Sequence, residues 1–162
     1  MKSIYILIIS IFLFSCAEKK DGFVQVSKLY NDFEMTKELS KKLEVSTQVK
    51  TQILDSLKFS IKQLEIQLNS DAKEELIRVY ELKKQEYLYK EGMFTEESQR
   101  LSQTYSDQTM NQINEYVQEF GKSNGYEYIY GASGNGSLMY AKDANDITDQ
   151  ILVFINNKYQ GK

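Results

Sequence analysis

Most of the chain carries a sparse helical pattern of hydrophobic positions. On one segment the apolar residues are spaced by four, three and four positions, at Leu57, Ile61, Leu64 and Leu68. The same spacing recurs later in the chain at Phe94, Ser98, Leu101 and Tyr105, with further apolar residues at Ile113, Val117 and Phe120. This spacing is typical of a coiled-coil seam. Because Ser, Lys and Gln interrupt it often, the pattern predicts two paired helices, and not the core of a compact globule.

The helical stretch is expected to run over residues 28–124 as one hairpin arm. It contains no Pro, and Gly occurs there only at positions 92 and 121. The turn is expected at residues 69–71, because Asn69 and Ser70 favour turns and caps and acidic residues follow at a new helix N-terminus. The alternative turn is at residues 92–95, where Gly92 would end one helix and Thr95 would cap the next. That turn leaves very unequal arms, so we favour the first and interpret Gly92 as a kink.

The arm is too long to fold back into a globule. A helix of roughly 40 residues is about 60 Å long at a rise of 1.5 Å per residue. A compact chain of this length has a radius of gyration of about 15 Å. The hairpin is therefore expected to project from whatever small body the other residues form.

Residues 23–27 and 126–162 are expected to form that body. The segment "FVQVS" at 23–27 favours a strand, and Ser27 is expected to cap a helix that begins near Lys28. Tyrosines alternate at positions 126, 128 and 130, "ASGNG" follows as a Gly-rich turn, and "SLMYAK" is expected to return as a strand. The tyrosine face is expected to lie in the body core or in a subunit interface.

A helix is expected to close the chain. Asp146 is placed to cap it, and Ile147, Ile151 and Ile155 lie along one side. Three short strands covered by one helix would form a sheet of marginal stability whose edges are open. Pairing between copies would cover those edges, so we expect a homo-oligomer whose sheets close around an axis.

The first 15 residues have the pattern of an export signal. Lys2 precedes an apolar run at residues 4–14, which is too short for a membrane span of about 20 residues. The run ends in "LFSC", which resembles a bacterial lipobox. That resemblance implies cleavage before Cys16, lipid attachment at Cys16 and a polar tether at residues 16–22. An ordinary signal peptide with a nearby cysteine is the alternative.

Composition narrows the possible chemistry. The chain has no His, the commonest general base, and its lone Cys can form neither an internal disulfide nor a Cys-rich zinc site. We find no nucleophile–base set, and the Gly-rich turn lacks the Lys of a phosphate-binding loop. We therefore expect no enzyme activity, no cofactor and no metal. The net charge of −3 does not indicate the positively charged surface that nucleic-acid binding requires.

The order of these segments resembles the OmpH/Skp family of periplasmic chaperones. The residues that carry the likeness are "VQVSKLYNDF" near the start and "GYEYIYGASGNGSLMYAKDANDITDQILVFINNKY" at the end, especially "GY", "LMYA", "DIT" and the late Ile-Asn pair. The resemblance implies a mostly α, α+β fold in which three subunits share a small β-body and three helical hairpins hang from it. It also implies an ATP-independent holdase that binds unfolded outer-membrane proteins.

Two features depart from the family pattern. Well-known members are soluble and basic, whereas this chain is acidic and its N-terminus predicts a lipid anchor. The resemblance thus implies a specialised member that lacks the positive charge used for electrostatic capture of clients. The alternative function is a lipid-anchored coiled-coil scaffold of the envelope that binds no client.

A holdase needs side chains that bind many sequences weakly, and aromatic and Met side chains of the arm could supply them. The candidate client contacts are Tyr80, Tyr87, Tyr89, Met93, Phe94, Tyr105 and Met110. The alternative for each of them is packing in the seam between the two helices.

Overall fold

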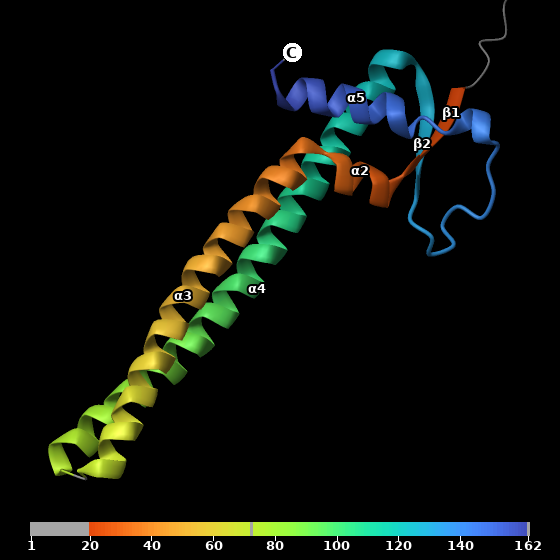
Figure 1. The fold of residues 1–162 in the computed structure, drawn as a ribbon. Coiled ribbons are helices and arrows are strands. Elements are labelled where there is room, and N and C mark those ends of the chain that lie inside the picture. Colours follow the sequence, from red (N-terminus) through yellow and green to blue (C-terminus); the bar gives the residue numbers. More distant parts are fainter. Residues whose placement is uncertain (1–19, 72, 162) are drawn as a thin grey trace, which may run out of the picture.

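Two long helices project from a small body in the computed structural model, which describes residues 20–71 and 73–161 (Figure 1). The elements in chain order are β1 (Lys20–Gln25), α2 (Val26–Asp32), α3 (Glu34–Ser70), α4 (Glu74–Asn124), β2 (Tyr126–Ala132), the 3-10 helix η1 (Asp143–Asn145) and α5 (Thr148–Tyr159). Helices α3 and α4 lie side by side along the arm, and α5 crosses its base. This is the mostly α, α+β architecture expected from the sequence.

The turn of the arm lies a few residues after the favoured prediction of 69–71, because Asn69 and Ser70 still belong to α3. Helix α3 ends at Ser70, and α4 begins at Glu74 with Glu75 also in its first turn. Gly92 lies inside α4, which is helical on both sides of it, so the alternative turn at residues 92–95 is wrong. Helix α4 is capped at its C-terminal end by Gly125, whose φ of 70° is left-handed and suits a residue without a Cβ.

The sheet of the body differs from the predicted hairpin. Strands β1 and β2 are parallel, with Phe23 opposite Tyr130. The expected returning strand is absent, since residues 133–142 contain no strand. The other side of β1 is taken by the start of the C-terminal segment, where the N–H of Ile147 donates to the carbonyl of Phe23 at 3.0 Å. A Cβ on Gly22 would lie 2.7 Å from the Ile147 side chain, so the glycine permits this close approach.

The start of the first helix in the described residues also corrects the prediction. Strand β1 spans Lys20–Gln25 instead of residues 23–27, and α2 begins at Val26 without a side-chain cap. Ser27 is therefore inside the helix. A break at Phe33, which the sequence pattern did not predict, separates α2 from α3, and the backbone there is extended (φ −68°, ψ 131°).

The core joins both ends of the chain to the C-terminal third of α4. Its buried residues are Val24, Leu29, Phe33, Ile113, Phe120, Ile147, Ile151 and Ile155. The predicted apolar side of the last helix is thus confirmed. The predicted tyrosine face is only partly in the core, because Tyr126 packs against it whereas Tyr128 and Tyr130 are exposed. Among the described residues, no helix is both long enough and apolar enough to cross a membrane.

Candidate functional site

The arm exposes many large hydrophobic side chains. In the described part of α3 they are Val45, Val49, Phe59 and Ile66, each at least half exposed. In α4 they are Ile77, Val79, Leu82, Leu88, Tyr89 and Met93. Their positions are not scattered, because most of them follow the same heptad spacing as the seam.

The exposed hydrophobic residues of α3 form one stripe. Counting from Val45 in steps of four and three gives positions 45, 49, 52, 56, 59, 63 and 66. The positions that are not apolar carry Gln52, Ser56 and Gln63, so the stripe contains no charged residue. Apart from Ile66, each stripe position comes one residue before a position that is buried or half-buried in the seam, such as Lys50 or Leu57. The stripe is therefore turned by about 100° from the seam.

Helix α4 has a matching stripe. Val79, Leu82, Tyr89 and Met93 fall at positions 79, 82, 89 and 93, and the remaining heptad position, 86, carries a glutamate. These residues also come one position before the half-buried seam residues of their helix. The carboxylate of Glu86 is paired within the helix, with Lys83 at 2.8 Å and Lys90 at 3.7 Å.

The two stripes lie on the same broad side of the hairpin. Two antiparallel helices are related by an axis perpendicular to their common plane, so positions that precede the seam on both helices face the same way. The side chains near the turn confirm this, since Ile66 and Val79 line one open hollow of about 610 Å³. We call this surface the apolar face and define it by Val45, Val49, Phe59, Ile66, Val79, Leu82, Tyr89 and Met93.

The opposite broad side of the arm is charged. A hollow of about 410 Å³ there is lined by both helices, with Lys58, Lys62, Glu65, Tyr80, Lys84, Tyr87 and Leu88 among its residues. Of the exposed large hydrophobic residues described in the arm, only Ile77 and Leu88 lie outside the apolar face. The hairpin is thus amphipathic across its two broad sides as well as along its seam.

The predicted client contacts fall into three groups. Tyr89 and Met93 lie on the apolar face and are exposed. Tyr80 and Tyr87 line the charged hollow. The third group is half-buried and consists of Phe94, Tyr105 and Met110. The structure thus brings together two of the candidates on one surface and places the others on different sides of the hairpin.

Tyr80 and Tyr87 are tied to acidic side chains. The Tyr80 hydroxyl donates to Glu65 Oε1 at 3.0 Å, and this hydrogen bond raises the pKa of the phenol. The Tyr87 hydroxyl donates to Glu91, and the ammonium group of Lys58 lies 5.3 Å from the centre of the Tyr87 ring. These contacts hold the two rings against the arm, in line with the packing alternative.

Several residues of the apolar face were missed from the sequence. Phe59, Ile66 and Leu82 were not named because the search followed aromatic and Met residues of the returning helix. The signal that would have found them is a second heptad series, offset by one residue from the seam. Such an offset series marks a helix with two apolar contact surfaces.

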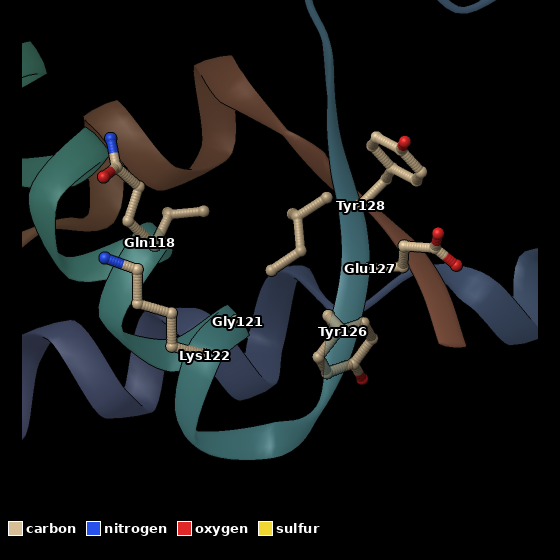
Figure 2. A pocket seen from close by; sticks show the side chains of 8 residues that line it. Gln118, Gly121, Lys122, Tyr126, Glu127 and Tyr128 are labelled. Carbon is tan, nitrogen blue, oxygen red and sulfur yellow. The ribbon is translucent and has the colours of Figure 1, made fainter. Parts of the chain in front are cut away.

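A smaller hollow lies in the body. It has a volume of about 240 Å³ and is lined by the end of α4 and by β2. Figure 2 shows Gln118 and Lys122 on α4 across from Tyr126 on β2. Within residues 20–71 and 73–161, no group of three or more acidic or sulfur-bearing side chains could hold a metal ion. The predicted lipid-attachment residue, Cys16, lies outside the described residues.

Comparison with known families gives one match. The model of a family described as "Outer membrane protein (OmpH-like)" matches residues 20–154, which include β1, the whole arm, β2 and half of α5. No curated protein matches the chain. The matched region contains every residue of the apolar face.

Proposed function

The chain belongs to the family of OmpH-like outer membrane proteins, and on that premise we propose that it is an ATP-independent holdase for unfolded envelope proteins. The family has a periplasmic, chaperone-like role. The clients in this proposal are unfolded outer-membrane proteins and other exported proteins that aggregate before they fold. The protein would bind them along its arm and release them without ATP hydrolysis.

The observation that carries the proposal is the apolar face. An exposed series of aliphatic and aromatic side chains that spans two helices is a surface that favours protein contact. Phe59 is 66% exposed and Tyr89 is 72% exposed, so both are available without any unfolding of the arm. Weak apolar contacts spread along such a surface suit a binder that accepts many sequences.

The body supports the proposal that the protein is a homotrimer. Exposed apolar side chains also gather there, at Tyr128, Tyr130, Met139, Tyr140 and Val153. The rings of Tyr128 and Tyr130 stack with centroids 5.9 Å apart, which presents a flat aromatic surface on β2. A second copy would remove this surface from water. Three arms around one axis would then enclose the client.

The lipid anchor remains part of the proposal and rests on the sequence alone. Cleavage before Cys16 and acylation there would hold the protein to a membrane of the envelope, because more than one acyl chain gives stable attachment. Mass spectrometry of the protein purified from its membrane should show a diacylglyceryl adduct on Cys16. Recovery of an unmodified mature chain from the soluble fraction would remove the anchor.

Suppression of aggregation tests the holdase function. An unfolded outer-membrane β-barrel protein is diluted from urea with and without the mature domain, and light scattering is followed. A holdase should keep the scattering low at a few-fold molar excess. Unchanged scattering would contradict the proposal and favour the scaffold alternative.

A further inference from the structure

From the charges and dimensions of the arm we infer that the apolar face binds uncharged, extended client segments about as long as one membrane-spanning β-strand, and that it does so without charge attraction. This inference rests on the proposed holdase function and names the substrate class of its binding surface. The partner is therefore an unfolded chain with apolar side chains and few charges, such as a strand of an outer-membrane barrel before it folds.

The first argument is the distribution of charge. The stripe on α3 contains no charged residue from Val45 to Ile66. On α4, the Glu86 carboxylate within the stripe is already neutralised by two lysines of its own helix. Three lysines, Lys58, Lys62 and Lys84, line the hollow on the opposite side of the arm, where the ammonium group of Lys58 lies near the Tyr87 ring.

Near the turn, Asp71, Lys73 and Glu75 line the same hollow as Ile66 and Val79. Along the rest of the apolar face, a charged client segment would lose hydration and gain no unpaired partner, so this part of the face favours uncharged segments.

The second argument is length. From Val45 to Ile66 the α3 stripe covers 21 helical steps, or about 32 Å at 1.5 Å per residue. A membrane-spanning β-strand has about 9–11 residues, which extend over about 30–37 Å at 3.3–3.4 Å per residue. One such strand, before it pairs with its neighbours, could therefore lie along the whole stripe.

The third argument is the chemistry between the apolar positions. Gln52, Ser56 and Gln63 separate Val49, Phe59 and Ile66 along the stripe. Amide and hydroxyl groups can donate and accept hydrogen bonds, so they can pair with the backbone of an extended segment whose own N–H and C=O groups have no strand partner. Neutral side chains of this kind avoid selecting for the charge of the client.

A matched pair of double variants tests the location of the surface. Ile66→Gln with Leu82→Gln changes one Ile and one Leu on the apolar face, and these side chains are 53% and 56% exposed. Ile77→Gln with Leu88→Gln makes the same chemical change outside that face, at side chains that are 44% and 57% exposed. Glutamine preserves helix propensity in both. Fluorescence anisotropy of a labelled, unfolded outer-membrane protein reports the Kd of each variant.

The apolar-face variant should raise the Kd by about tenfold, since two partly exposed aliphatic side chains contribute about that much to binding. The control variant should bind like the wild type. Equal binding by the two variants would overturn the inference while leaving the holdase function in place. A wild-type protein that does not bind the client would instead overturn the proposed function itself.

Charge insertion tests the mechanism. Gln63→Glu and Gln63→Lys place opposite charges in the middle of the α3 stripe, and both should weaken binding because either charge must lose water on contact. Gln99→Glu and Gln99→Lys are the matched controls at an exposed position that follows the seam on α4. Opposite effects of the two Gln63 variants would show that charge attraction drives capture and would overturn the inference.

The dependence of the Kd on ionic strength tests the absence of charge attraction independently. Screening weakens attraction between exposed charges, so the wild-type Kd should change by less than about twofold between 0.05 M and 0.5 M NaCl. A steep loss of binding with salt would overturn the inference. The oligomeric mass of Ile66→Gln with Leu82→Gln should equal that of the wild type. A smaller mass would mean that the apolar face joins copies of this chain, which would also overturn it.

Discussion

At the residue scale, Asn156 shows how one side chain connects distant parts of the body. Its Oδ1 accepts the N–H of Glu34, the first residue of α3, at 2.8 Å, and its Nδ2 donates to the carbonyl of Asp32 at 3.4 Å. Helix α3 has no cap from its own neighbouring side chains. The late Ile-Asn pair that contributed to the family resemblance therefore has a physical role, since the asparagine of α5 caps a helix that begins 122 residues earlier.

Replacement of this residue should destabilise the body. Asn156→Ala leaves the Glu34 N–H without its acceptor, and we expect a loss of about 1–2 kcal/mol in the free energy of unfolding. Urea unfolding at a fixed protein concentration measures the loss. The exposed neighbour Asn157 supplies the control, because Asn157→Ala removes a similar side chain outside this contact. Equal effects of the two variants would show that the cap contributes nothing specific.

Asp146 gives the body a dependence on pH. Burial acts to raise the pKa of its carboxyl group, but hydrogen bonds from Thr148 and Gln25 outweigh it and lower the pKa. Oδ1 accepts from the Thr148 N–H at 2.9 Å, and Oδ2 accepts from Gln25 Nε2 at 2.7 Å. The predicted cap at Asp146 is wrong by one residue, because the N-cap of α5 is Ile147. The Asp146 carboxylate nevertheless connects the start of α5 to the end of β1.

The sign of the effect follows from the lowered pKa. A carboxyl group whose pKa is lower in the folded state contributes stability above its unfolded pKa and loses that contribution as the pH falls through the folded value. Asp146→Asn should therefore be less stable than the wild type at pH 7, and the difference should shrink below about pH 4. Urea unfolding between pH 7 and pH 3 checks this. A difference that stays constant with pH would exclude the carboxylate as its source.

At the element scale, the seam of the arm contains a buried lysine. Lys50 is 9% exposed, and its ammonium group donates to Ser98 Oγ at 3.2 Å and pairs with Glu97 at 3.2 Å. A polar group in a seam costs stability in return for a fixed register. Because Glu97 is half exposed, it can be hydrated if the lysine is removed.

The arm should tolerate an apolar residue at this position. Lys50→Leu should be neutral or should stabilise the hairpin by about 1 kcal/mol, since Leu fits the seam and has a similar helix propensity. Lys50→Ala should destabilise it, because it leaves the space unfilled. Thermal unfolding followed by circular dichroism compares the two variants. If both variants lose the same stability, the lysine contributes through its charge and not through its packing.

The elements were predictable where local chemistry decides them. The turn of the arm follows from Asn69 and Ser70, and the apolar side of α5 follows from the spacing of its isoleucines. The returning strand was wrong, because β2 pairs in parallel with β1 and the chain after β2 joins the sheet only at the other side of β1, around Ile147. The break at Phe33 could not be predicted from the local sequence. The new helix α3 is capped by Asn156, which is close in space and distant in sequence.

The candidate surface was only partly predictable for a similar reason. Residue type directed the search to Tyr89 and Met93, which do lie on the apolar face. Residue type alone could not separate them from Phe94 or Met110, because exposure depends on the position of each residue relative to the seam. Leu82 and Ile66 looked like ordinary helix residues until the seam was located.

At the scale of the whole molecule, the apolar residues of the arm and of the body core serve three purposes, beside the exposed apolar group of the body. The seam joins α3 to α4, the core holds the body together, and the apolar face remains exposed along the arm. The hairpin therefore does not need to open in order to present binding side chains. Because the two broad sides differ in character, the direction in which the arm faces in an assembly decides whether its hydrophobic side is turned inward or toward solvent.

The pairing of β1 with the last third of the chain has a consequence for how the protein forms. The Gln25 N–H donates to Thr148 Oγ1, which lies 123 residues later in the sequence. The body therefore cannot complete its folding until nearly the entire polypeptide has emerged. The arm, in contrast, forms through contacts between residues on either side of its turn. Such contacts are local in sequence near the turn, and local contacts form fast. A chain delivered from its N-terminus would thus form its arm first and join its two ends last.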